Sequence, residues 1–146
     1  MLGYKVSSYI AYQKACDFLD VANTLNQQED FKLIPTVVNA AFSCELFLKA
    51  LLIWKQQSAK PIKIHPLEEL FSLLDQVDQA EIKKASDIFN WSSFMQESSK
   101  AFEKWRYVHE NDAFLMISIG DLIRFSKALK ECYEKKHSLK EVFEDD

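Results

Sequence analysis

The residues best suited to chemistry in this sequence lie in one short segment, Lys104-Trp-Arg-Tyr-Val-His-Glu110. On a helix, Phe102, Arg106 and His109 share one face because they stand at i, i+4 and i+7. A guanidinium holds a phosphate by two parallel hydrogen bonds, and an imidazole exchanges a proton near neutral pH. Arg106 and His109 are therefore candidate catalytic residues for phosphodiester cleavage without a metal. Arg106 would offset the developing charge and His109 would transfer protons.

Two other interpretations of Arg106 and His109 stay open. In one, they belong to a structural salt-bridge network with Glu45 as the natural partner, because a carboxylate on so apolar a helix has to be paired. In the other, they bind phosphate or a nucleotide without cleaving it. Glu45 and Lys49 also stand at i, i+4 in the favourable order, which explains the pair as a structural one. The alternative is that Glu45 orients a residue of the site without touching the substrate itself.

Basic residues around Arg106 are candidates for binding phosphate. Lys100 and Lys104 lie within two helical turns of it, whereas Tyr107 and Glu110 are expected either to support the site residues from outside or to be structural. Eighteen Lys and Arg against 22 Asp and Glu give a net charge of −4, so the field of the whole molecule does not attract nucleic acid. RNA would need this local patch, which a dimer can enlarge by merging two copies. The alternative interpretation is a solvated helix face.

The remaining histidines and the glycines predict neither a metal site nor a cofactor. His65 precedes Pro66, where its ring can cap or pack on a helix start, and His137 stands near the end of the last helix, a favourable place for a cation. Three scattered histidines without an i, i+4 ligand pair give no metal signature. Two isolated glycines cannot form a phosphate-binding loop.

The cysteines predict a reducing compartment. They are odd in number, widely spaced and embedded in apolar helical patterns: Cys16, Cys44 and Cys132. This favours reduced, packed thiols in a cytoplasmic protein over disulfides or a zinc site. The N-terminus shows no signal peptide, and Lys49 interrupts the longest apolar stretch well before the ~20 residues that a membrane span needs. We therefore expect a soluble protein with no membrane contact.

The elements that position these residues are predicted to be helices. Two glycines and three prolines leave too few turn residues for a many-stranded sandwich or barrel. Helical periodicity predicts about five helices over residues 7–26, 35–57, 66–77, 79–110 and 113–137, the fourth broken or bent near 90–93. We expect one domain over residues 1–146, with an acidic tail at about 138–146.

One segment and two single residues predict further details of these helices. Between Ile34 and Trp54, 15 of 21 residues are apolar, which predicts the central helix of a bundle. Asp78 is expected to cap the fourth helix, and Gly120 to mark a close contact between helices.

Three segments together resemble the HEPN domain, a small helical domain of prokaryotic toxins, defence systems and nucleotide-linked modules. Ala40–Leu52, which holds Glu45 and Lys49, is similar to the central helix of that family. His65-Pro-Leu-Glu-Glu-Leu70 is similar to the segment that follows it, and Phe102-Glu-Lys-Trp-Arg-Tyr107 to the segment with the family arginine. The resemblance covers most of the chain and implies a single up-and-down helical bundle.

The resemblance also implies a function and a partner. Active members of the family are metal-independent endoribonucleases in which an arginine and a histidine from two subunits form one site. Here only Tyr107 and Val108 separate Arg106 from His109, a shorter gap than the family motif has, and Asn111 stands where some toxins carry a tyrosine. The spacing therefore favours a dimerising module that binds RNA, a nucleotide or a protein such as an antitoxin. The alternative is a ribonuclease of toxin-antitoxin or defence type that uses Arg106 and His109.

Overall fold

The computed structural model describes residues 3–30, 32–99 and 118–137. Within these residues every regular element is a helix, as the sequence predicts. The helices are α1 (Gly3–Gln27), α2 (Leu33–Gln56), α3 (Leu67–Ser72), α4 (Gln76–Ser86), α5 (Trp91–Ser99) and α7 (Ile119–Lys136). The predicted all-α bundle is thus confirmed.

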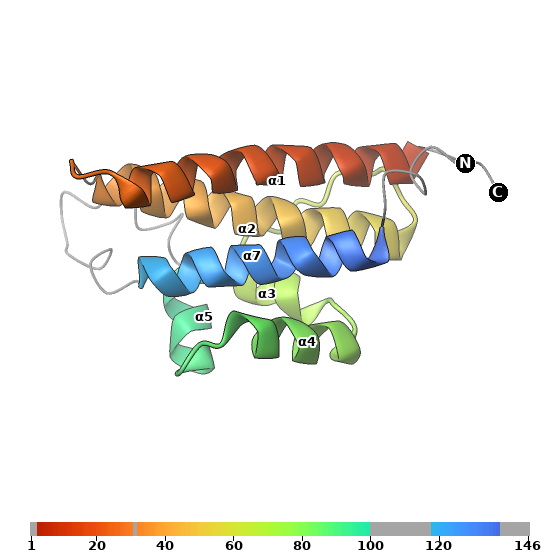
Figure 1. The fold of residues 1–146 in the computed structure, drawn as a ribbon. Helices are drawn as coiled ribbons and strands as arrows, with labels where there is room; N and C mark the ends of the chain where they lie inside the picture. Colours follow the sequence, from red (N-terminus) through yellow and green to blue (C-terminus); the bar gives the residue numbers. More distant parts are fainter. Residues whose placement is uncertain (1–2, 31, 100–117, 138–146) are drawn as a thin grey trace.

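The long helices α1, α2 and α7 run side by side, and the shorter α3, α4 and α5 form a second group on the side away from α1 (Figure 1). The helix α2 packs along both α1 and α7, whereas α4 packs mainly on α7. The helix α3 contacts α2 and α5. The bundle therefore has α2 at its centre.

The central position of α2 follows from its composition. Cys44 and Leu48 are fully buried, as are most of the apolar residues between Val37 and Leu52. By length and hydropathy this helix is also the one candidate for a membrane span in the described residues, but 72% of its most apolar window is buried inside the fold. An apolar helix covered by its neighbours is what a bundle core requires.

Hydroxyl groups join the three long helices inside this core. The Ser8 Oγ on α1 donates a 2.6 Å hydrogen bond to the backbone oxygen of Ala50 on α2, and it lies 3.1 Å from the Tyr133 hydroxyl on α7. The Ser43 and Ser126 hydroxyls lie 2.6 Å apart between α2 and α7. Because buried polar groups are costly without partners, these contacts fix the register of the helices. Ser8 is therefore a buried residue within α1, which begins at Gly3 and so earlier than the predicted residue 7.

Aromatic rings attach the short helices to α7. The Phe125 ring lies 5.5 Å from the rings of Trp91 and Phe94 on α5 and 6.0 Å from Phe71 on α3, in edge-to-face geometry. Such ring pairs add to the burial of apolar area. The cluster places α3 and α5 against one side of α7.

The ends of α3 and α4 differ from the prediction. The helix α3 ends at Ser72, and α4 begins at Gln76 after Asp75. Asp78 is not a cap, because its Oδ2 accepts a 2.6 Å hydrogen bond from the Lys136 ammonium on α7. A partner 58 residues away in the chain leaves no sign in the local pattern.

The break or bend predicted near residues 90–93 is a full break between α4 and α5. The helix α4 ends at Ser86, and its C-cap residue Asp87 has a left-handed backbone with φ of 51°. Asn90 then caps α5, since its side-chain oxygen accepts the backbone N–H of Ser93 at 3.3 Å.

The last helix also begins later than predicted. Ser118 is extended, and its side-chain oxygen accepts the backbone N–H of Asp121 as an N-cap, so α7 begins at Ile119 and not near Ala113. Among the described residues, a Cβ on Gly120 would meet only the side chains of Arg124 and Ser118. The described part of the chain therefore gives no support to the expectation that Gly120 marks a close contact between helices. The predicted acidic tail at 138–146 lies outside the described residues.

Candidate functional site

Most of the predicted site residues lie outside the part of the chain that the structure describes. This holds for the two candidate catalytic residues and for four of their predicted neighbours: Arg106, His109, Lys100, Lys104, Tyr107 and Glu110. Their roles remain predictions. Glu45 and Lys49 are described, and they are the starting point for the site.

Glu45, Lys49 and His65 form one polar group, here named the Glu45 cluster. The Lys49 ammonium donates a 3.0 Å hydrogen bond to Glu45 Oε2, one turn away on α2. His65 comes from the segment before α3, and its Nδ1 lies 3.4 Å from the same Glu45 oxygen and 3.2 Å from Lys49 Nζ. The buried carboxylate thus has a cation and an imidazole as neighbours, which offsets the cost of its burial.

The two contacts of His65 Nδ1 exclude one another. When Nδ1 carries a proton it can donate to Glu45, and when it carries none it can accept from Lys49. In either case Nδ1 makes its hydrogen bond within the cluster, so a ligand would bind at the other ring nitrogen, Nε2. The side chain of His65 is 65% exposed, so this nitrogen is accessible to a ligand.

The cluster has the groups needed to hold an anion. An ammonium has three N–H donors, and Lys49 directs at most two of them at Glu45 and His65. One donor remains for an external acceptor such as a phosphate oxygen. An imidazole held by a carboxylate is also the arrangement that general acid–base catalysis uses.

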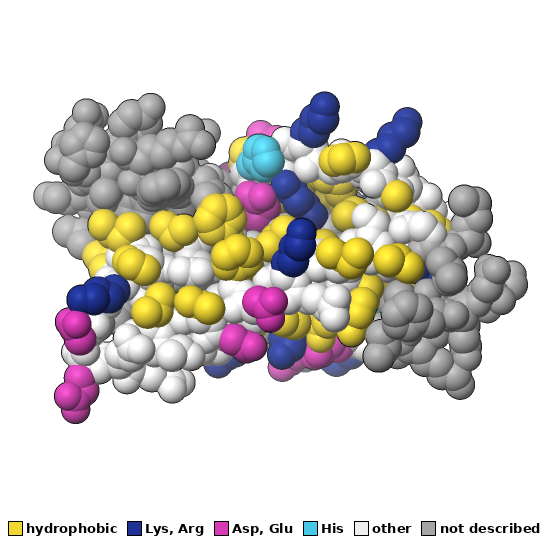
Figure 2. All heavy atoms as spheres, turned by 90° about the horizontal axis from the view of Figure 1, so that it is seen from above, with side chains coloured by type: hydrophobic (Ala, Val, Ile, Leu, Met, Phe, Trp, Pro, Cys, Tyr) yellow, Lys and Arg dark blue, Asp and Glu magenta, His cyan; other side chains and the backbone are white. Residues whose placement is uncertain are grey.

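The Glu45 cluster continues an apolar stripe of α2. Ile34, Val38, Phe42 and Leu46 recur at i, i+4 and are exposed or half-buried, and Glu45 and Lys49 share their side of the helix. The Phe42 ring stacks on Phe18 of α1 at 5.4 Å. Figure 2 shows this side of the molecule, where histidine, acidic and basic side chains meet beside a run of hydrophobic ones.

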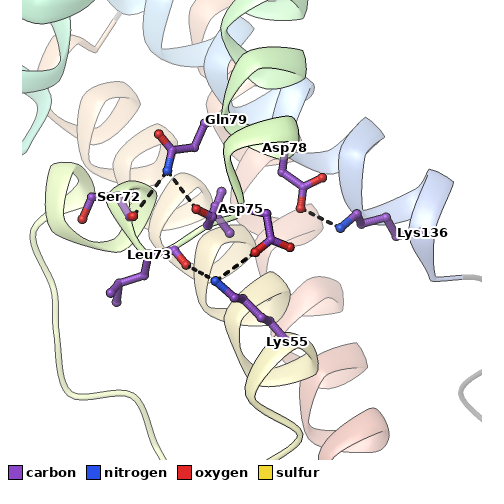
Figure 3. Close-up of polar contacts among 8 residues, drawn as sticks. Lys55, Ser72, Leu73, Asp75, Asp78, Gln79 and Lys136 are labelled. Carbon is purple, nitrogen blue, oxygen red and sulfur yellow. Dashed lines mark hydrogen bonds and ion pairs between the residues drawn. The ribbon is translucent and has the colours of Figure 1, made fainter.

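A second polar group lies where α2, α4 and α7 come together (Figure 3). Lys55, in the last turn of α2, donates a 2.6 Å hydrogen bond to the backbone oxygen of Leu73 and lies 3.2 Å from Asp75. Gln79 donates to the backbone oxygens of Ser72 and Leu74. These contacts close the turn between α3 and α4, and they account for the group as structural.

His137 is the C-cap residue of α7, and the predicted cation there is wrong. Burial and, to a smaller extent, the charge of Lys136 lower the pKa of His137 to about 4, against the opposing effect of Asp78. The imidazole is therefore neutral at neutral pH. Its ring stacks on Trp54, a contact that cannot be foreseen from its place near a helix end.

The three cysteines are free thiols. Burial raises the pKa of Cys44 to about 12 and that of Cys132 to about 11, and it also raises the pKa of Cys16. Protonated, packed thiols of this kind are unreactive toward oxidants. This agrees with the predicted absence of disulfides.

Sequence reasoning missed the part that His65 takes in the cluster. The i, i+4 spacing of Glu45 and Lys49 is a local signal, whereas His65 reaches them across a loop from 16 residues beyond Lys49. The signal in the sequence was a carboxylate on an apolar helix, because a buried carboxylate needs hydrogen-bond donors around it.

Comparison with known proteins gives one match. A family model described as HEPN domain matches residues 10–142. No curated protein and no solved structure matches the chain.

Proposed function

Since this chain belongs to the HEPN domain family, we propose that it is a cytoplasmic helical module that dimerises and binds RNA or a nucleotide. The observation that carries the proposal is the Glu45 cluster, in which a nearly buried lysine is held beside an exposed histidine. Glu45 positions the Lys49 ammonium, and the free donor of Lys49 together with His65 Nε2 binds a phosphate group. Charged hydrogen bonds of this kind are among the stronger ones in proteins.

Dimerisation rests on the apolar surface next to the cluster. On α1, Ile10 and Val21 are exposed and lie on one side of the helix, and on α2 the stripe from Ile34 to Leu46 continues the surface. Figure 2 shows hydrophobic side chains gathered along this side of the molecule. A contiguous apolar surface favours burial against a partner. A second copy seated there brings two Glu45 clusters to one interface, so that an acidic protein holds RNA in a groove lined by both subunits.

Binding is tested with labelled single-stranded RNA and with a fluorescent ATP analogue, each by fluorescence anisotropy at several salt concentrations. We expect the double substitution Glu45→Gln/Lys49→Gln and the single substitution His65→Ala to weaken binding at least tenfold. The control is Lys84→Gln, an exposed lysine in the last turn of α4. Absence of binding by the unsubstituted protein, or equal binding by all variants, would contradict the proposal.

The second candidate function is metal-independent endoribonuclease activity of toxin-antitoxin or defence type, with Arg106 and His109 as catalysts. The observation that favours it is His65, an exposed imidazole whose Nδ1 faces a carboxylate. Such a ring can transfer a proton at a phosphodiester. The family relationship makes an antitoxin the expected protein partner in this case.

Cleavage of labelled single-stranded RNA in excess EDTA separates the two functions. If the enzyme function holds, the unsubstituted protein cleaves and folded Arg106→Ala and His109→Ala proteins do not. If no protein cleaves while RNA binding persists, the chain is a binding module. Equal cleavage by all three proteins would point to a contaminating nuclease and count against the enzyme function.

A further inference from the structure

Two carboxylates and a thiol meet where α4 packs on α7. Asp78 and Glu81 stand one turn apart on α4, and Cys132 faces them from α7. Each residue offers one ligand atom, and these atoms all lie within 4.8 Å of one another. A single cation binds all three atoms only after the side chains draw closer together, because metal–oxygen and metal–sulfur bonds are about 2.0–2.3 Å long.

The state of Cys132 is a second and separate observation. Only 5% of this residue is exposed, and among the described residues no hydrogen bond joins its thiol to another group. A cavity of about 30 Å³ adjoins it, lined in part by Glu81, Glu131 and Cys132. A water-sized occupant needs about 10–15 Å³, so the cavity has room for a small ligand.

We propose that Asp78, Glu81 and Cys132 bind a divalent cation of the zinc class and that the cation joins α4 to α7. A thiolate with two carboxylate oxygens suits Zn²⁺ better than the hard cations Mg²⁺ and Ca²⁺, which take oxygen ligands. Binding forms one metal–sulfur and two metal–oxygen bonds and releases the thiol proton to solvent. Three protein ligands leave the fourth tetrahedral position to water in the adjoining cavity.

Exposed Glu81 gives the cation its entry, and Lys136 is its competitor. The Lys136 ammonium lies 2.6 Å from Asp78 Oδ2, where it neutralises the carboxylate that the cation needs. The Lys136 side chain is 40% exposed, so it can turn into solvent when the cation arrives. Removing this ammonium therefore strengthens binding of the cation.

The sequence does not predict the site, because its expected absence of metal rested on histidine spacing and on the wide separation of the cysteines. Here the ligands come from two helices that are distant in the chain and close in the fold. Only Asp78 and Glu81 form a local pair, and acidic pairs at i, i+3 are common on solvated helices.

Cobalt titration of the full-length protein tests the proposal. Co²⁺ takes zinc sites, and a thiolate ligand gives it a near-ultraviolet charge-transfer band. We expect this band to saturate at one equivalent and to disappear when Zn²⁺ is added. Cys132→Ser should abolish the band, and Glu81→Gln should weaken binding at least tenfold. The matched control Cys16→Ser removes a half-buried thiol on α1 and should leave the titration unchanged.

Two further measurements keep the test decisive if a variant folds poorly. In the unsubstituted protein, Zn²⁺ should raise the unfolding temperature, because a cation that binds only the folded state stabilises it. Lys136→Met should tighten Co²⁺ binding several-fold. Failure of the unsubstituted protein to give the band, retention of the band in Cys132→Ser, or its loss in Cys16→Ser would each overturn the site.

Discussion

The imidazole of His137 lies nearly flat against the indole of Trp54, with ring centroids 3.8 Å apart and an angle of 21° between the ring planes. The contact joins the C-terminal end of α7 to that of α2. Since burial lowers the pKa of His137 to about 4, with Lys136 adding to the effect, the stacked ring is the neutral form.

This contact predicts a stability that falls in mild acid. In the unfolded chain the imidazole titrates near pH 6.5, whereas in the folded chain its pKa is about 4. Between these values the unfolded chain binds a proton that the folded chain does not, so the free energy of unfolding decreases as the pH falls through this window. Urea unfolding at about pH 7.5, 5.5 and 4.5 measures how the free energy of unfolding changes with pH.

The control for this prediction is His137→Gln, which removes the titrating group. We expect the variant to lose less stability over the same pH interval than the unsubstituted protein. An equal loss in both proteins would assign the acid sensitivity to other groups.

The Glu45–Lys49 pair predicts a difference between two kinds of substitution. Lys49→Met leaves the buried Glu45 carboxylate without its ammonium partner, and breaking a buried pair in this way costs about 3 kcal/mol. Glu45→Gln/Lys49→Gln removes both charges and should cost clearly less. Thermal and urea unfolding of both proteins checks the order, and a double variant less stable than Lys49→Met would refute it.

The apolar surface of α1 and α2 predicts the effect of charge on association. Val21 is 46% exposed on α1, and Phe42 is half-buried on α2. An arginine at either position places a charge in the proposed dimer interface, so Val21→Arg and Phe42→Arg should both be monomers. Sedimentation equilibrium gives the mass of each variant. The control is Val77→Arg, at an exposed position of α4, and this variant should stay dimeric. A monomeric unsubstituted protein, or two dimeric variants, would rule out this interface.

The ring cluster around Phe125 predicts how firmly α3 and α5 are held. Phe125 is fully buried against Phe71, Trp91 and Phe94. Phe125→Ala removes these ring contacts and leaves a cavity, which costs about 3–5 kcal/mol of unfolding free energy. Phe125→Leu should cost less, and urea unfolding distinguishes the two. A loss below ~1 kcal/mol in the alanine variant would mean that the site collapses and refills.

The fold class and the central helix could be predicted from local patterns. Apolar periodicity identifies α1, α2 and α7, and the 15 apolar residues between Ile34 and Trp54 exceed what one helix face can display. Glu45 and Lys49 are neighbours by helix geometry alone. These features depend on residues within a few helical turns of one another, and the spacing of such residues can be read from the sequence.

The helix ends and the full site could not be predicted in this way. Asp78 resembles a cap, but its partner is Lys136 on another helix. His137 resembles a cation at a helix end, but Trp54 of α2 and burial make it neutral. His65 joins Glu45 only because the loop before α3 folds back on α2. In each case the deciding contact is tertiary, and local propensity carries no information about it.

The position of α2 between α1 and α7 has a consequence for synthesis of the chain. The ribosome makes α1 and α2 one directly after the other, and the two helices can pair as a hairpin as soon as both have emerged. The side of α2 that holds Ser43 and Cys44 has its hydrogen-bond partners on α7, which is synthesised much later. These partners are the Ser126 hydroxyl and the backbone oxygen of Leu122. During that interval the most apolar helix of the nascent chain presents one side to water, a state that invites aggregation. Chaperone binding to the emerging chain is therefore expected to be strongest after α2 has appeared and to end once α7 docks.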